Sequence, residues 1–98
     1  MMETLDDQLQ PFRNAIDRID QQILELLNKR GELSLKIGTL KHRYDHTLNN
    51  IRNRERELEI LNNITTHNRG PFSDMQLTTI FELIFEEHRS LQRGIKDD

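Results

Sequence analysis

The sequence contains no cysteine, no tryptophan and no valine, and it has only 2 prolines and 4 glycines in 98 residues. Without cysteine the chain forms no disulfide, offers no thiol nucleophile and builds no zinc–thiolate centre. The missing valine and the scarce aromatic residues argue against a β-sheet, which favours β-branched and aromatic side chains. The 4 glycines are scattered, so no glycine-rich loop is present to hold a phosphate.

Charge and hydropathy exclude further classes of protein. The formal net charge is −3, so the chain lacks the basic excess that binds nucleic acid. No apolar run approaches the length that spans a membrane, and residues 1–10 are acidic and polar, unlike a signal peptide. We therefore expect a cytoplasmic protein with one domain over residues 1–98, because this length fits a single domain. The 28 leucine, isoleucine and phenylalanine residues argue against disorder, and the low apolar fraction of 34% suits an elongated helical assembly with much exposed surface.

Residues 12–44 carry the dominant pattern, in which apolar side chains recur at steps of three and four and so share one face of a helix. The stripe consists of Phe12, Ile16, Ile19, Ile23, Leu26, Leu33, Ile37, Leu40 and Tyr44. We expect this helix to become firm at Pro11, since proline is tolerated in a first turn. It would measure roughly 50 Å at ~1.5 Å per residue, whereas a compact domain of this size has a radius of gyration near ~13 Å. We therefore expect a second copy of the chain to cover the stripe, in preference to a break at Gly31 or Gly38.

Two shorter helices are predicted after the first. Residues 45–50 have the composition of a turn, and a helix follows over residues 51–65. After a break at residues 67–71, Ser73 and Gln76 form a capping-box pattern that starts a third helix over residues 74–93. The sequence thus predicts an all-α fold with a long, a short and a medium helix.

Each predicted helix interrupts its apolar face with polar residues. They are Arg13, Arg30 and Lys41 in the first helix, Arg54 and Glu55 in the second, and His88 and Gln92 in the third. Taken singly, such a residue is more often an ion-pair partner, a snorkelling side chain or a satisfied core histidine. Together, several cations, one carboxylate and one amide indicate a cavity for a small, oxygen-rich dianion.

Other chemistries find little support in the sequence. His42 and His46 have a spacing that can chelate a metal, but only Asp45 lies close by. No Ser, His and Asp arrangement suggests a nucleophile with its base. We therefore predict no metal and no cofactor, and a cavity that acts by binding and electrostatics.

The chain resembles the all-helical chorismate mutases over nearly its whole length. The resemblance rests on Phe12-Arg13, residues 16–20 (Ile-Asp-Arg-Ile-Asp), residues 26–30 (Leu-Leu-Asn-Lys-Arg), Ile37-Gly38 with Lys41, Arg54-Glu55-Arg56 and Gln92. Arg13, Arg30 and Lys41 also keep the separations found in the family. Residues 62–72 and 80–85 look closest to the mutase domain fused to some bacterial DAHP synthases.

This resemblance implies a fold and a reaction. The fold is the type II arrangement, an intertwined homodimer with three helices per chain. The reaction is the Claisen rearrangement of chorismate to prephenate in aromatic amino acid biosynthesis. It takes place within one molecule and needs no nucleophile, metal or proton transfer. Catalysis then comes from holding the folded conformer and stabilising charge on the breaking ether bond.

The resemblance also implies roles for individual residues. Arg30 holds one substrate carboxylate bidentately, and Arg13 reaches across from the partner chain to a carboxylate. Lys41 and Gln92 donate to the ether oxygen, where negative charge develops. Glu55 accepts a hydrogen bond from the ring hydroxyl.

Three further positions belong to the implied binding site. Arg54 supplies positive potential near the carboxylates. Ile51 stands where the family usually has an aspartate, and contributes there only if the contact is made by its backbone N–H. His88 stands where the family usually has a serine, and is a candidate to hydrogen-bond a carboxylate, crowd the pocket or alter substrate choice.

The residues leave other functions open. The related lyase that splits isochorismate into salicylate and pyruvate shares this fold, and an amino-substituted chorismate is another candidate substrate. A non-enzymatic alternative is a regulatory module that binds chorismate or prephenate and controls a DAHP synthase. A purely structural helical dimer leaves the aligned polar residues unexplained.

Overall fold

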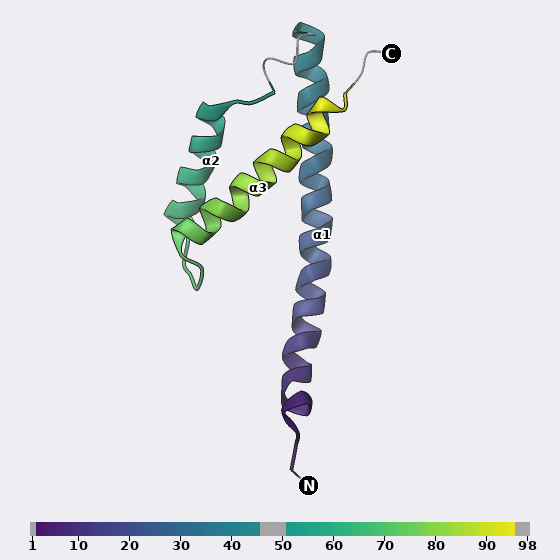
Figure 1. Cartoon of the computed structure of the whole chain (residues 1–98), viewed down its shortest axis with the longest axis vertical. Coiled ribbons are helices and arrows are strands. Elements are labelled where there is room, and N and C mark those ends of the chain that lie inside the picture. The colour runs from purple at the N-terminus through teal and green to yellow at the C-terminus, as the bar shows by residue number, and fades with distance from the viewer. Residues whose placement is uncertain (1, 46–50, 96–98) are drawn as a thin grey trace. The chain divides into compact units, whose positions relative to one another are not determined.

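The computed structural model describes residues 2–45 and 51–95 and is built from helices. They are α1 (Leu5–Tyr44), α2 (Arg54–His67) and α3 (Asp74–Arg93), labelled in Figure 1. The described residues contain no strand, so the prediction of an all-α fold with a long, a short and a medium helix is confirmed. Within this part of the chain, no helix combines the length and the apolar character needed to cross a membrane.

Helix α1 begins at Leu5, so the predicted start at Pro11 is wrong. The backbone N–H of Thr4 donates to Asp7 Oδ2 at 3.1 Å, and the backbone N–H of Asp7 donates to Thr4 Oγ1 at 3.1 Å. This reciprocal cap satisfies two N–H groups at the helix start and offsets the hydrogen bond that Pro11 cannot make. From there α1 continues without a break to its end.

The chain divides into two units, Met1–Glu32 and Leu33–Asp98. The first unit contains the N-terminal part of α1, and the apolar stripe along this part is exposed in the single chain. Its side chains, with exposed fractions between 47% and 69%, are Phe12, Ile16, Ile19, Ile23 and Leu26. Such a row of apolar side chains on one helix face is the pattern of a surface that another element covers.

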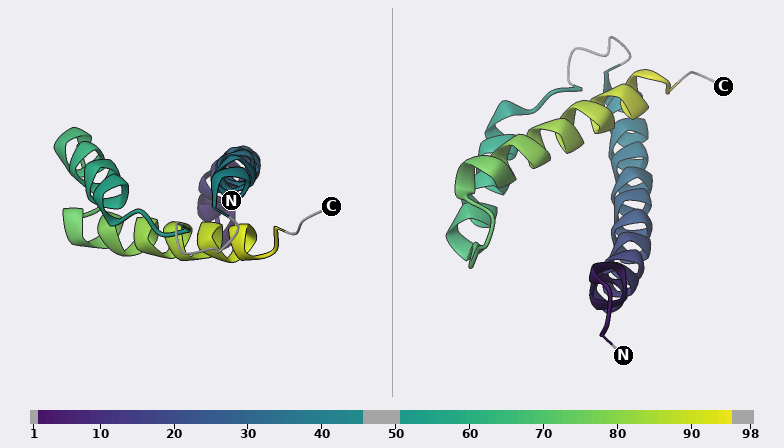
Figure 2. Two further views of the ribbon diagram at one scale, coloured as in Figure 1. Left: turned by 90° about the horizontal axis from the view of Figure 1, so that it is seen from above. Right: turned by 60° about the horizontal axis from the view of Figure 1, so that its bottom comes forward.

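In the second unit, α2 and α3 form a hairpin and lie side by side in the views of Figures 1 and 2. Asn68 organises the turn between them. Its side-chain amide donates to the Phe72 carbonyl at 2.9 Å and to Asp74 Oδ1 at 2.8 Å, while its Oδ1 accepts from the Gly70 N–H at 2.9 Å. Gly70 has a φ of 72°, a left-handed conformation that favours glycine.

The starts of the two shorter helices are set by their caps. Helix α3 begins as predicted, with the Ser73 N–H donating to Gln76 Oε1 at 2.9 Å and the Gln76 N–H donating to Ser73 Oγ at 3.1 Å. Helix α2 begins at Arg54 and not at Ile51 as predicted. The side chain of Asn53 accepts a backbone N–H of the first turn at 3.0 Å and so fixes the start three residues later.

A carboxylate buried between α2 and α3 joins the two helices. Glu57 Oε2 lies 2.6 Å from Arg89 Nη1, and these side chains are only 11% and 13% exposed. Glu57 Oε1 lies 3.3 Å from Arg52 and 3.5 Å from Arg54. A carboxylate this buried is tolerated because several guanidinium groups compensate its charge.

Candidate active site

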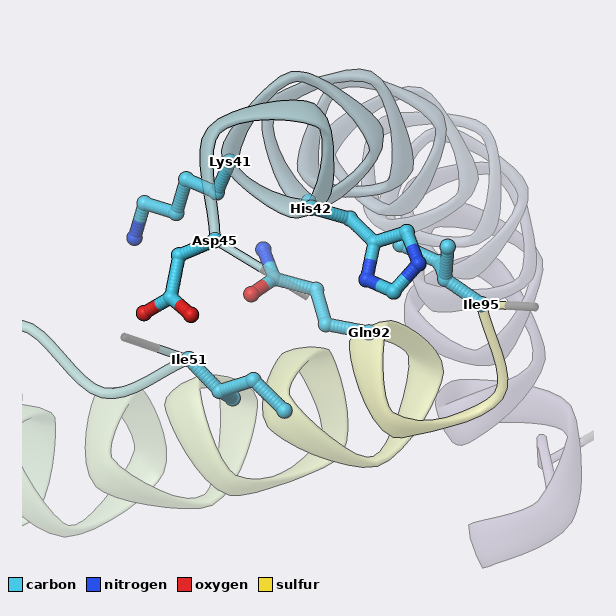
Figure 3. A pocket seen from close by; sticks show the side chains of 7 residues that line it. Lys41, His42, Asp45, Ile51, Gln92 and Ile95 are labelled. Carbon is cyan, nitrogen blue, oxygen red and sulfur yellow. The ribbon is translucent and has the colours of Figure 1, made fainter. Parts of the chain in front are cut away.

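The last turns of α1 and of α3 enclose a hollow in the second unit, shown in Figure 3. Its volume is about 230 Å³, part of which is open to solvent. The lining residues are Gly38, Lys41, His42, Asp45, Ile51, Gln92 and Ile95. The structure therefore brings together three of the predicted site residues, Lys41, Ile51 and Gln92, from three separate segments of the chain.

Gly38 allows α1 and α3 to approach closely at this hollow. A Cβ atom at this position would lie 2.6 Å from Ile95 Cδ1 and 2.8 Å from Gln92 Cγ. Both distances are shorter than contacts that real side chains make, so a larger residue here must displace its neighbours. The glycine thus lets the Gln92 side chain lie directly against α1.

Gln92 is buried, with an exposed fraction of 7%, and its amide is held by Ser34 on α1. The Nε2 atom lies 2.9 Å from the Ser34 carbonyl oxygen and 3.0 Å from Ser34 Oγ. Because a carbonyl oxygen can only accept, the nitrogen end of the amide must be the end that faces Ser34. The Gln92 Oε1 atom is buried and finds no hydrogen-bond partner among the described residues.

Figure 3 shows the result of this arrangement. The nitrogen of the Gln92 amide is turned toward α1 and its oxygen is turned away from it. Lys41 on α1 and Asp45, which directly follows α1, lie on the same side of the hollow, with the ammonium and the carboxylate at their ends. The lining thus offers an ammonium, an imidazole, a carboxylate and an amide, groups that orient and polarise a ligand through hydrogen bonds and charge.

His88 lies one turn before Gln92 on α3 and is half-buried. Its Nδ1 atom is 2.7 Å from the Ile84 carbonyl oxygen, which can only accept, so Nδ1 carries a proton in this contact. The contact fixes the orientation of the ring. His88 does not belong to the lining of the hollow, and its role toward a ligand stays a prediction.

The two predicted site residues at the start of α2 lie outside the hollow lining. Arg54 is 60% exposed and its Nη1 atom lies 3.5 Å from Glu57 Oε1. Glu55 is exposed, and the buried carboxylate of this helix is Glu57. The binding roles of Arg54 and Glu55 therefore stay predictions.

Arg13 and Arg30 belong to the first unit, Met1–Glu32. Arg13 Nη1 lies 3.6 Å from Asp6 Oδ1, and both side chains are largely exposed, so this ion pair holds the arginine weakly. Arg30 is half-buried. Their roles toward a substrate also stay predictions.

Five residues that build the hollow were not predicted as site residues from the sequence: Ser34, Gly38, His42, Asp45 and Ile95. Ser34 and Gly38 share one face of α1 with Lys41, since their spacings are four and three, and Asp45 directly follows the end of the helix. Two small residues four positions apart, Ser34 and Gly38, allow close packing of another helix and could have indicated this face. The apolar periodicity of the helix does not include them. Among the described residues, no three or more metal-ligating side chains lie together. His46, which was paired with His42 as a possible metal chelator, lies outside the described residues.

Comparison with known proteins adds to this geometry. Residues 12–93 match the model of the family described as chorismate mutase type II. The chain belongs to this family. The match includes every lining residue of the hollow except Ile95, and every residue predicted from the sequence to belong to the site.

Solved structures of the family share the fold. The chain is similar to chorismate mutase form II from Thermus thermophilus, with 32% identity, a TM-score of 0.81, and coverage of 92% of this chain and 99% of that one. It is also similar to form I from the same organism, with 34% identity, a TM-score of 0.74, and coverage of 83% and 98%.

Curated relatives carry a second activity in their names. The chain is 37% identical over 95 residues to a bifunctional chorismate mutase/prephenate dehydratase of Neisseria gonorrhoeae, covering 97% of this chain and 25% of the relative. It is 36% identical over 94 residues to the corresponding protein of Aquifex aeolicus, covering 92% and 25%. The chain thus spans about a quarter of the length of these relatives. They pair the mutase with a dehydratase, in place of the DAHP synthase that the sequence analysis expected.

Proposed function

We propose that this chain catalyses the Claisen rearrangement of chorismate to prephenate, as a chorismate mutase of the cytoplasm. The proposal depends on one observation: Lys41 and Gln92, the expected donors to the ether oxygen, line a single hollow in a chain of the type II family. The reaction breaks a C–O bond and forms a C–C bond within one molecule, so the protein has no covalent step to perform.

The geometry of the hollow suits this chemistry. As the ether bond breaks, negative charge develops on its oxygen, and preorganised donors that face this atom lower the barrier. Lys41 supplies an ammonium from α1, and Gln92 approaches from α3. Removing one donor of this kind typically costs ~2.7–4 kcal/mol, or roughly 100- to 1,000-fold in rate.

The substrate carboxylates need further cations, which we assign from the family resemblance. Arg30 binds one carboxylate bidentately, and Arg54 adds positive potential. Glu55 accepts from the ring hydroxyl, Ile51 contributes through its backbone N–H, and His88 lies near a carboxylate. No metal and no cofactor takes part in this scheme.

We further propose that two copies of the chain form the working enzyme. Part of the hollow of about 230 Å³ is open to solvent, so further walls are needed to enclose a ligand. The exposed stripe of α1 offers the contact surface. Covering its five side chains, each about half exposed, stabilises a dimer by roughly 4–8 kcal/mol per chain. Arg13 of one chain would then complete the pocket of the other.

The primary test is an absorbance time course with chorismate and the purified chain. We expect the wild type to consume chorismate and Arg30→Ala to lose the activity. Arg69→Ala serves as the control, because Arg69 is an exposed arginine of the α2–α3 turn and should keep wild-type turnover. Equal turnover in Arg30→Ala and the wild type would show that the pocket assignment is wrong.

A mixing experiment tests the shared pocket. We expect Arg13→Ala and Arg30→Ala to be inactive separately. After unfolding and refolding together, half of the dimers contain one chain of each kind, and each of these has one intact and one doubly altered pocket. About a quarter of the wild-type activity should therefore return. No recovery, together with a monomeric mass in solution, would contradict the shared pocket and leave the mutase activity to the first test.

Other outcomes would favour the alternatives. Salicylate released from isochorismate, without turnover of chorismate, would identify a lyase. Binding of chorismate or prephenate without turnover would identify a regulatory module, for which a DAHP synthase is the partner to test. The bifunctional relatives suggest instead that the mutase product passes to a prephenate dehydratase, and we propose that this chain performs the mutase part of that pair.

A further inference from the structure

Gln92 faces the hollow with the wrong end of its amide for the role proposed above. Its Nε2 atom lies 2.9 Å from the Ser34 carbonyl oxygen and 3.0 Å from Ser34 Oγ, so both of its N–H groups are directed to acceptors on α1. Its Oε1 atom is the end left without a hydrogen bond among the described residues. In this state neither N–H group of the amide is available to donate to a ligand.

For Gln92 Nε2 to donate to an ether oxygen, the amide group must make about half a turn around the Cγ–Cδ bond. The oxygen Oε1 then faces Ser34, where the backbone carbonyl cannot donate to it. A hydroxyl can both accept and donate, so Ser34 Oγ can accept from Nε2 before the turn and donate to Oε1 after it. Ser34 is itself buried, with an exposed fraction of 6%, so water does not readily replace this hydroxyl.

We infer that Ser34 is a positioning residue that acts through Gln92, and that its hydroxyl stabilises both orientations of the amide. The inference rests on the proposed mutase activity. Without the hydroxyl, the turned amide leaves its buried oxygen without a donor, which disfavours the productive orientation. The substrate carboxylates are held by other residues, so the loss affects kcat more than KM.

The test compares steady-state kinetics of Ser34→Ala, Gln92→Met and the double variant with chorismate as substrate. We expect Ser34→Ala to lower kcat roughly 5- to 100-fold with little change in KM, which is the range expected for one unsatisfied buried polar group. In the Gln92→Met background no amide remains to be oriented, and Ser34→Ala should change kcat less than twofold. Ser90→Ala is the matched control, because Ser90 is an exposed serine on α3 and should keep the wild-type kcat.

A second variant separates the hydroxyl from its volume. Ser34→Cys fills nearly the same space but forms weak hydrogen bonds, so it should lower kcat as Ser34→Ala does. It also provides the test if Ser34→Ala fails to fold.

Three results would overturn the inference. They are a wild-type kcat in both Ser34 variants, an equal loss of kcat in the wild-type and Gln92→Met backgrounds, or a change confined to KM. A wild-type chain that does not consume chorismate would overturn the proposed function as well, so the two failures are distinguishable.

Discussion

Replacing Gly38 with alanine tests how closely α1 and α3 must approach at the hollow. The new Cβ would lie 2.6 Å from Ile95 Cδ1 and 2.8 Å from Gln92 Cγ. The Ile95 atom is the end of a flexible side chain and can turn away. The Gln92 atom lies in the middle of a side chain whose amide is bound to Ser34, so it cannot move without disturbing that contact.

Two opposing terms set the size of the effect. Alanine gains about 1 kcal/mol over glycine in a helix interior. Overpacking of a closely packed contact costs about 1–3 kcal/mol. The variant should therefore lose roughly 0–2 kcal/mol of stability, and each kcal/mol lowers Tm by about 4–8 °C in a domain of this size. The rate should fall further, by roughly 10- to 100-fold in kcat, because a small displacement of a positioned group impairs catalysis strongly.

The assay combines thermal unfolding at a fixed protein concentration with chorismate turnover. Gly94→Ala is the control, because its Cβ would meet its nearest neighbour, the Leu91 carbonyl oxygen, at 3.4 Å, an ordinary contact. Adding Ile95→Ala to Gly38→Ala should not restore the rate, since the Gln92 contact remains crowded. A Gly38→Ala chain that is about 1 kcal/mol more stable and turns over at the wild-type rate would refute the reasoning.

Three further predictions concern stability. Arg89→Met removes the shortest contact of the buried Glu57 carboxylate and should cost roughly 3 kcal/mol in urea unfolding, near the lower limit for a broken buried pair because other arginines remain. A hydrogen bond from Arg89 lowers the pKa of Glu86 below its ordinary value of 4.5. The difference in the free energy of unfolding between the wild type and Glu86→Gln should therefore be full above pH 4.5 and shrink as the pH falls through the lower pKa of the folded state. A difference that stays constant with pH would contradict this. Thr4→Ala removes the cap of α1 and should cost about 1 kcal/mol locally, seen as faster hydrogen exchange at the Asp7 amide.

The sequence predicted the fold class and the third helix well because these depend on local signals. The pattern of Ser73 and Gln76 is a complete capping box, and the structure contains both of its hydrogen bonds. The start of α1 was misplaced because Pro11 was given more weight than the cap at Thr4. Both are local signals with opposite effects. The reciprocal cap favours a helix over the six residues between Thr4 and Pro11, and these residues are helical in the structure.

The site was predicted less completely, for a different reason. Lys41 and Gln92 lie far apart in the sequence, and their meeting was predicted only by combining polar positions of separate helices with the family resemblance. Ser34 and Gly38 matter because they let another helix approach, and no property of a single helix reveals that approach. Residues that act through close contact with a distant element are therefore the ones that sequence patterns leave out.

The burial pattern connects the stability of this chain to its assembly. Among the described residues, Phe85 is the buried hydrophobic side chain, whereas Ser34, Glu57 and Gln92 are buried polar ones. Folded domains depend on apolar burial to offset the loss of conformational entropy, so covering more of the apolar side chains stabilises a chain with this pattern. If a second copy covers the stripe of α1, folding and association become one equilibrium, and Tm then rises with protein concentration. If the second copy also covers the hollow, water is excluded from it further, and an ammonium and an amide then act more strongly on developing charge.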